Sequence, residues 1–223
     1  MGQEARDLNR DSQNSSTAAE IKQFPEKGGV NTGLIIARAK AIITDPAGTW
    51  PKIAEAPEST ASIFKNYILV MAAIPPVCMF IGSGLFGSMS TGAALTMAIV
   101  QYVMSLAVMF VGSYVIQFLS PKFEGSGDQT QALKLLAYSY TPAYLAGVLN
   151  IIPVLSIIGA LISLYGIYLF AVGANPVLGI PQERKVGFTV ASVVCILVMS
   201  LILGMIAGAL FVSSMVTRGM MMG

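Results

Sequence analysis

Charged residues are scarce in this chain of 223 residues: they make up 11% of it, against about 25% in an average soluble domain. Three long stretches contain none at all, namely 66–121, 135–182 and 186–217. About 20 apolar residues, rising 1.5 Å each, cross a hydrocarbon core of about 30 Å. The sequence therefore predicts an all-α integral membrane protein.

Histidine is also missing, and the two cysteines, Cys78 and Cys195, lie within apolar runs. These absences argue against a disulfide scaffold and against a metal site built from cysteine and histidine. Catalysis would need a nucleophile with its base, paired carboxylates or a metal, and the acidic residues are not paired in the sequence. We expect no enzymatic activity, no cofactor and no metal. A net charge of +2 likewise gives no reason to expect a nucleic-acid partner.

The polar residues gather at the N-terminus. Residues 1–30 mix both signs of charge with few aromatic residues, which is a composition typical of disorder. We therefore expect a disordered cytoplasmic tail there. Residues 31–65 follow as an interfacial amphipathic helix and a juxtamembrane elbow. On a helical wheel, Arg38 and Lys40 flank an apolar face, so both could reach lipid phosphates. That face consists of Ile35, Ile36, Ala39, Ile42 and Ile43. The alternative is a partly ordered linker.

The elbow contains the stretch "TDPAGTWPKIAEAP", residues 44–57, which includes the single tryptophan of the chain. Asp45 followed by Pro46 is typical of a helix N-cap and the first helical position. Trp50 is expected at the depth of the lipid headgroups, where indole rings concentrate. A surface of this kind could bind a protein partner as well as membrane lipids. The candidate juxtamembrane interaction surface is Asp45, Pro46, Trp50 and Pro57.

Five apolar segments form the expected membrane domain, residues 66–212, and a short C-terminal tail, 213–223, follows it. The expected bundle of five transmembrane helices covers 66–86, 95–119, 134–151, 155–174 and 187–212. The third segment is short and contains Ser139, Thr141 and Pro142. The loop charges would be the same if the third and fourth segments formed a re-entrant hairpin, so that alternative stays open.

The cations in the short loops predict the orientation, because lysine and arginine are enriched on the cytoplasmic side. Six cations lie on one side of the expected spans, and Arg218 lies on the other. We therefore expect a multi-pass protein of the bacterial inner membrane, with the N-terminus in the cytoplasm and the C-terminus outside. The six are Lys52, Lys65, Lys122, Lys134, Arg184 and Lys185.

Several polar or helix-kinking residues interrupt the spans. Proline removes a backbone donor and tends to kink a helix, and freed carbonyls line the sites of some transporters. No charged residue lies in the middle of a span, so a proton relay is not expected. The candidate intramembrane cluster is Pro75, Gln101, Tyr138, Pro142 and Asn150. Helix packing is the plainer interpretation of buried Gln and Asn.

Small residues recur at helical spacing in the last two spans. Such stripes let helix backbones approach closely in lipid. They predict packing within the chain or, for the fifth span, a homodimer seam. The candidate helix-packing residues are Gly159, Ser163 and Gly166 in the fourth span, and Ser200, Gly204 and Gly208 in the fifth.

Four motifs carry a family resemblance. Ile43-Thr44-Asp45-Pro46 with Trp50 precedes the first span, and three further motifs follow: "YSYTPAYLAGVLNIIP" at 138–153, "LYGIYLFAVG" at 164–173 and "PQERKVGFTV" at 181–190. Over about residues 34–212 the chain resembles the bacterial branch of the Yip domain family, the Ypt/Rab-interacting five-span membrane proteins. The resemblance implies a five-helix membrane domain with a cytoplasmic N-terminus. Eukaryotic members are trafficking factors that bind Rab-type GTPases, an activity that the resemblance does not transfer to this chain.

Two functions remain as hypotheses. The first is a non-enzymatic membrane scaffold or adaptor, or a membrane-organising factor, acting through a cytoplasmic juxtamembrane surface. The second is a small transporter or lipid-handling protein that uses the proline-kinked first and third spans. A cavity around Pro75, Gln101, Tyr138 and Pro142 would favour the second.

Overall fold

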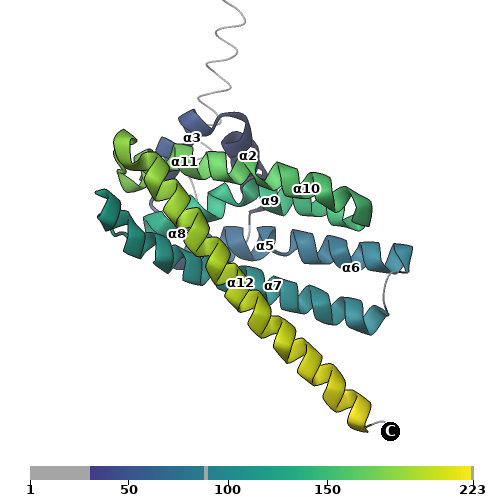
Figure 1. Ribbon diagram of the computed structural model, residues 1–223. Helices are drawn as coiled ribbons and strands as arrows, with labels where there is room; N and C mark the ends of the chain where they lie inside the picture. The colour runs from purple at the N-terminus through teal and green to yellow at the C-terminus, as the bar shows by residue number, and fades with distance from the viewer. Residues whose placement is uncertain (1–30, 88–89, 222–223) are drawn as a thin grey trace, which may run out of the picture.

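A computed structural model describes residues 31–87 and 90–221 of the chain, so the expected tail at 1–30 lies outside the described residues. Every regular element among the described residues is a helix (Figure 1). The predicted all-α class is thereby confirmed.

The helices follow one another with short connections. Two of them, α2 (Thr32–Thr44) and α3 (Pro46–Glu55), precede the bundle. The first long helix is composite, and so is the segment between α7 and α10. The remaining elements are α4 (Thr60–Ile63), the π-helix η1 (Phe64–Ile68), α5 (Leu69–Met71), α6 (Ile74–Phe86), α7 (Thr91–Leu119), η2 (Ser120–Phe123), α8 (Gln129–Ser139), α9 (Thr141–Ala146), η3 (Gly147–Ile151), η4 (Pro153–Leu155), α10 (Ser156–Ser163), α11 (Tyr165–Leu178) and α12 (Gln182–Met221).

Side-chain caps decide where several helices begin. The Asp45 carboxylate accepts a hydrogen bond from the Gly48 amide at 3.0 Å, and Pro46 is the first residue of α3, as the sequence predicted. Ser59 caps α4 and Ser90 caps α7 in the same way. Because these caps lie before the apolar runs, both helices begin earlier than the apolar segments at 66 and 95. At the other ends, Gly87 and Gly179 take the left-handed conformation, with φ of 58° and 72°, and so terminate α6 and α11.

Four stretches of helix are long and apolar enough to cross a membrane: Thr60–Gly84, Thr91–Phe123, Ser156–Leu178 and Gln182–Ile206. The expected third span, 134–151, is not among them, so five spans are not confirmed. That segment is broken into α8, α9 and the 3-10 helix η3, with Pro142 near the start of α9. The helix that contains its first part, α8, is also polar at its start, because it begins with Gln129, Thr130 and Gln131.

The first long helix is interrupted before Pro75 and Pro76, as prolines within a span predict. Neither proline can donate a backbone hydrogen bond, and the chain makes a turn at Ala72 and Ala73 between α5 and α6. The carbonyl of Leu69 instead accepts a hydrogen bond of 3.0 Å from the Tyr102 hydroxyl of α7. The neighbouring helix thus satisfies a backbone group that the irregular turn leaves free.

Helix α8 is the centre of one end of the bundle. From Ala132 to Ser139 every residue is buried, because α7 and α11 pack against it with α4 and α3. A Cβ atom on Gly112 of α7 would lie 3.0 Å from Leu136, and one on Gly173 of α11 would lie 2.7 Å from Leu135. Glycine at both positions lets α7 and α11 approach this central helix closely.

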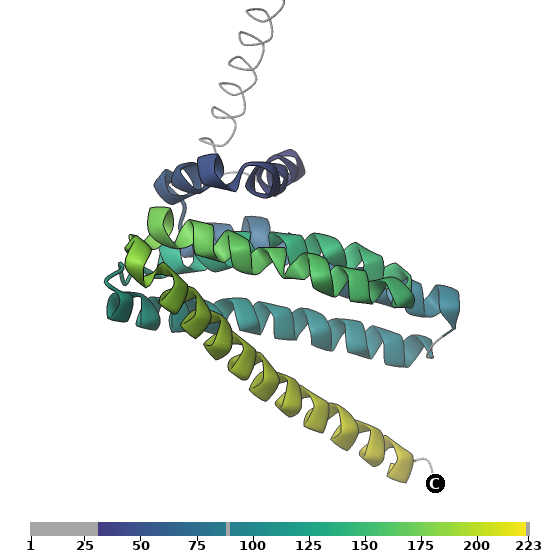
Figure 2. The same ribbon diagram turned by 45° about the horizontal axis from the view of Figure 1, so that its top comes forward.

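Helices α2 and α3 form a separate layer over the bundle, and α12 leaves it at the other side. Figure 2 shows the two short helices lying across one face near α11, which α3 contacts extensively. The first part of α12 packs on α7 and α11, and the helix then diverges from its neighbours (Figure 1). One end of the bundle is therefore covered on one face, while α7 and α12 form the opposite side.

The contact between the end of α8 and α11 allows a direct test of this packing. A Cβ atom on Gly166 would lie 2.6 Å from the backbone oxygen of Ser139, so Gly166→Ala requires a helix to shift. We expect the melting temperature in detergent, followed by circular dichroism, to fall by several degrees. Gly84→Ala is the matched control because its Cβ would meet nothing within 4 Å, and alanine favours helix by up to about 1 kcal/mol. Equal melting temperatures for the two variants would contradict the contact.

Candidate functional site

The most unusual side chain of the molecule is Arg38, which lies on the buried face of α2. Ile35 and Ile42 are one turn away on either side and are buried with it. The arginine has 0% of its surface exposed. The expectation that Arg38 reaches lipid phosphates is therefore wrong, because α2 turns this side chain inward against the bundle.

An ion pair holds the buried guanidinium. Arg38 Nη1 lies 2.6 Å from the Glu58 carboxylate, and both side chains are almost fully buried. The same nitrogen donates a hydrogen bond to the Tyr138 hydroxyl of α8, and the guanidinium carbon lies 5.8 Å from the centre of the Tyr138 ring. Residues from three separate segments, α2, the α3–α4 connection and α8, thus meet at one charged group.

Lys134 supplies a second buried cation, from the middle of α8. Its ammonium group donates hydrogen bonds to the carbonyls of Ala56, at 2.7 Å, and Ala54, at 3.2 Å. Both carbonyls belong to the C-terminal end of α3, where a cation is favoured by the helix dipole. Burial lowers the pKa of Lys134, while the Glu58 carboxylate acts in the opposite direction.

We call Arg38, Glu58, Lys134 and Tyr138 the latch. It contains two cations and one carboxylate, all removed from water. Breaking a buried ion pair by removing one partner typically costs about 3–5 kcal/mol, because the remaining charge stays buried without compensation. The latch therefore ties α2, the end of α3 and the α3–α4 connection to α8.

Trp50 lies beside the latch and is completely buried. Its ring meets Tyr138 edge-on, with centroids 6.5 Å apart. A Cβ atom on Gly173 would lie 2.6 Å from the indole, so only glycine leaves room for the ring on α11. The expectation that Trp50 lies among lipid headgroups is wrong, because α3 directs the indole into the protein.

The polar network continues from Tyr138 toward the first span. The rings of Tyr138 and Tyr67 lie 4.5 Å apart, and the Tyr67 hydroxyl lies 2.7 Å from that of Thr141. All three side chains are buried. Among the other elbow residues, Asp45 and Pro57 are exposed and Pro46 is half-buried. The structure thus separates the predicted surface into an outer part and a buried anchor, Trp50.

The predicted intramembrane residues do not form one cavity. Tyr138 belongs to the latch, Pro142 is buried, and Gln101 and Asn150 are half-buried. Pro75 of α6 packs against Gly147 of η3, where an added Cβ would lie 2.5 Å from the proline ring.

Two cavities of the described part of the chain lie elsewhere. One, of about 410 Å³, lies between α6 and α7 and is lined by residues that include Phe80 and Leu95. The other, of about 290 Å³, lies between α8–α9, α10–α11 and α12, with Tyr140 and Ile196 in its wall. Side chains in both walls are mainly apolar, and neither wall includes Pro75, Gln101, Tyr138 or Pro142.

The small residues of the two last spans differ in their surroundings. An added Cβ on Gly159 would lie 3.2 Å from the backbone oxygen of Ala146, and Ser163 donates a hydrogen bond to the Gly159 carbonyl. Gly166 packs on Ser139. By contrast, nothing lies within 4 Å of a Cβ on Gly204 or Gly208, and Ser200 is half-buried. The glycines of α10 and α11 serve contacts within the chain, whereas Gly204 and Gly208 of α12 do not.

Sequence reasoning missed the latch, although it noted its residues individually. Arg38 is three residues from Ile35 and four from Ile42, which is the spacing of one helical face. Lys134 is the first residue of the expected third span, and this position indicates a cation at the edge of the helix bundle. Glu58 carries no such signal, because it lies between two helices and its burial depends on the chain path. Within the described ranges, no group of three or more His, Cys, Asp or Glu residues could hold a metal ion.

The latch makes a clear prediction for stability. Glu58→Gln keeps the shape of the side chain but removes the negative charge of the buried Arg38–Glu58 ion pair, so we expect a loss of about 3 kcal/mol in the free energy of unfolding. Glu124→Gln is the control, because Glu124 pairs with Arg184 at 2.9 Å on the exposed surface and its loss should cost at most about 1 kcal/mol. Denaturant unfolding in detergent measures both. Equal losses would refute the structural importance of the buried pair.

Comparison with known proteins agrees with the membrane character of the chain. The Yip1 domain family matches residues 40–206, a range that includes most of the latch and four membrane-crossing helices. The chain is 25% identical over 144 residues to the Inner membrane protein YohC of Escherichia coli strain K12, and equally to that of strain O6:H1. Each alignment covers 59% of this chain and 74% of the relative. No solved structure matches the chain.

The family match covers residues 40–206, and all four helices that are long and apolar enough to cross a membrane lie within that range. The family that matches the chain is not a catalytic one by its description. This chain is a membrane protein that belongs to the Yip1 domain family.

Proposed function

We propose that this protein is a non-enzymatic scaffold or adaptor of the bacterial inner membrane, with its N-terminus in the cytoplasm and its C-terminus outside. The observation that carries the proposal is the latch, which holds α2 and α3 on the bundle through buried charges. Together these two helices make a platform, defined as residues 32–55. A platform held this firmly is suited to presenting a fixed surface to a partner.

The outer face of the platform is polar and carries both signs of charge. Lys40, Asp45 and Glu55 are exposed, as is Pro51. Charged and polar side chains set the specificity of an interface and guide the approach of a partner. We therefore propose a cytoplasmic protein as the partner of this face, with membrane lipids around the bundle.

Transport has less support from the structure. Transporters place polar or charged groups at a site near the middle of the membrane, and the walls of the two cavities described above are mainly apolar. The charged latch is at one end of the bundle, beside the platform. Its charged side chains bind one another and the carbonyls at the end of α3, and these contacts hold the platform on the bundle.

In-cell photo-crosslinking tests the adaptor proposal. A photoreactive amino acid at Pro51 or Glu55, both exposed on α3, should form a discrete product with a cytoplasmic protein. The same group at Ile157, exposed on α10 in a membrane-crossing helix, is the control. The product should decrease several-fold when Lys40→Glu reverses a charge on the platform without touching the latch. Identical products from Pro51 and Ile157 would contradict the proposal.

A second copy of the chain is the proposed partner of α12. Gly204 and Gly208 are four residues apart, and within the described residues nothing lies within 4 Å of a Cβ added to either, which is the arrangement of a helix-dimer seam. Gly204→Ile with Gly208→Ile should therefore convert a dimer into a monomer, as measured by light scattering in mild detergent. Gly84→Ile is the control, and a monomeric parent protein would exclude the seam.

A further inference from the structure

The exposed apolar side chains of the bundle show where lipid chains contact the protein, and they do not reach equally far on all sides. On α7 they run from Leu95 to Phe118, about 35 Å of helix at 1.5 Å per residue. On α12 they run from Val186 to Ile206, about 30 Å. Both lengths match a hydrocarbon core of about 30 Å, so this face contacts lipid over the whole thickness of the core.

The opposite face has much shorter apolar stretches. On α6 they run from Val77 to Phe86, about 14 Å. On η4, α10 and α11 they run from Val154 to Tyr168, about 21 Å. No large apolar side chain is exposed in 60–76 or in 169–178, two segments that the structure describes throughout. About a third to a half of the expected hydrocarbon contact is missing on this face.

Contacts with α8 show that α7 and α11 differ in exposed apolar surface at the same level of the bundle. Gly112 of α7 and Gly173 of α11 meet neighbouring residues of α8, Leu136 and Leu135. Tyr114 follows Gly112 by two residues and is 48% exposed. Asn175 follows Gly173 by two residues, toward the same end of the bundle. Beyond Tyr114, Phe118 is still 67% exposed, while Asn175 is followed by the end of α11.

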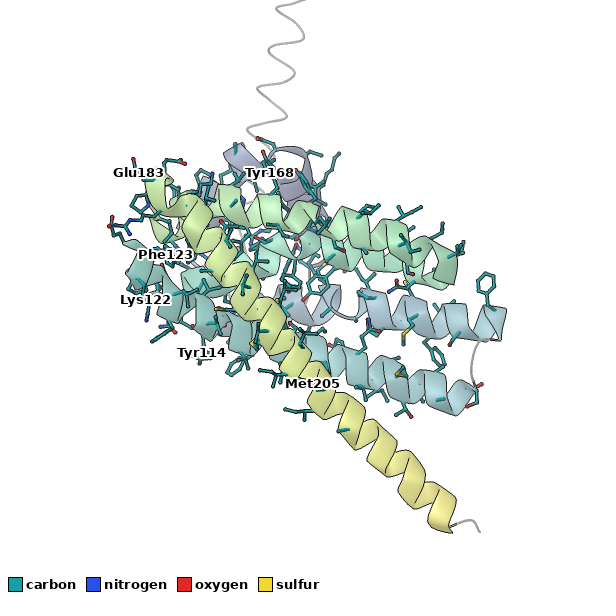
Figure 3. The ribbon with its side chains drawn as sticks, viewed as in Figure 1. Tyr114, Lys122, Phe123, Tyr168, Glu183 and Met205 are labelled. Carbon is teal, nitrogen blue, oxygen red and sulfur yellow. The ribbon has the colours of Figure 1, made fainter. Side chains whose placement is uncertain are left out.

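The two faces are separated in space. Figure 3 shows Tyr114 on α7 and Tyr168 on α11 at opposite edges of the molecule, with Met205 farther along α12. The apolar surface thus ends near Tyr168 on one edge and continues past Tyr114 on the other. A flat bilayer of uniform thickness cannot match both edges of an upright bundle.

The platform occupies the place of the missing lipid contact. Trp50 of α3 covers Gly173, and the Tyr165 hydroxyl donates a hydrogen bond of 3.1 Å to the Ile43 carbonyl at the end of α2. The outer face of the platform is not suited to acyl chains, because Ile36 is its one exposed large apolar side chain within residues 31–63. Lys40, Asp45 and Glu55 on that face are suited to water and lipid headgroups.

We infer that the bilayer meets this protein at unequal depth, with a full hydrocarbon core against α7 and α12 and a core about one half to two thirds as thick against α6 and α10–α11, where the platform lies at headgroup level. The ligand of this surface is a phospholipid layer thinned on one side of the protein. Mismatch is accommodated by thinning or tilting of the lipids, at a cost of fractions of a kcal/mol per Å. The inference deepens the membrane-organising part of the proposed function and does not depend on a protein partner.

Depth-dependent fluorescence quenching tests the inference. The background is the full chain with Cys78→Ala and Cys195→Ala, reconstituted in phosphatidylcholine vesicles. Single cysteines replace Tyr114 or Asn175, and each carries an environment-sensitive fluorophore. We expect nitroxide on the lipid chains to quench the Tyr114 probe several-fold more than the Asn175 probe, and aqueous iodide to quench the Asn175 probe several-fold more.

Two further variants guard the test. Asn175 donates a hydrogen bond to the Ile180 carbonyl, so Glu55→Cys on the outer face of α3 gives an independent reporter of the platform side. Leu161→Cys, within the short apolar stretch of α10, should be quenched by the chain nitroxide and calibrates the scale. Strong quenching of both Asn175 and Glu55 by the chain nitroxide would overturn the inference, as would strong quenching of Tyr114 by iodide. Loss of the crosslinked partner would sink the adaptor proposal and leave this measurement unchanged.

Discussion

The ion pair between Arg38 and Glu58 is the constraint on which the arrangement of this protein depends. Two charges leave water to form it, together with the nearby cation of Lys134, and such a group is stable only with its partners in place. Tyr138 and the carbonyls at the end of α3 supply those partners. Because the partners come from α2, the α3–α4 connection and α8, the pair keeps residues far apart in sequence together. The position of the platform, the burial of Trp50 and the exposed charges of the outer face all follow.

The platform in turn decides how the protein meets the membrane. By covering α11 near Gly173, it replaces lipid on one face and leaves α7 and α12 to contact lipid on the other. Helix α8 can be buried from Ala132 to Ser139, although it is short and begins with polar residues, because α3, α4, α7 and α11 pack against it. In lipid, such irregular and polar segments are tolerated only inside protein. The polar character that excludes α8 from the membrane-crossing helices is therefore compatible with its central place in the fold.

The sequence predicted the helical class, the membrane character, the family and the cap at Asp45 correctly, because each depends on local composition or on neighbouring residues. It also indicated the irregularity at Pro75 and the weakness of the third span. Its errors at Arg38 and Trp50 have one cause. Both residue types are common at membrane surfaces, and a helical wheel shows which residues share a face without showing what that face packs against.

Hydropathy by itself located the four helices that are long and apolar enough to cross a membrane, since an uncharged run about 20 residues long needs no tertiary partner to be favoured in lipid. Local caps by themselves determined where α3, α4 and α7 begin. Only the tertiary structure decided that Glu58 is buried beside Arg38, that Gly173 accommodates Trp50, and that one face of the bundle is covered by protein. These contacts join residues separated by about 20 to more than 100 positions. Their energies depend on burial and distance, which exist only after the chain has folded.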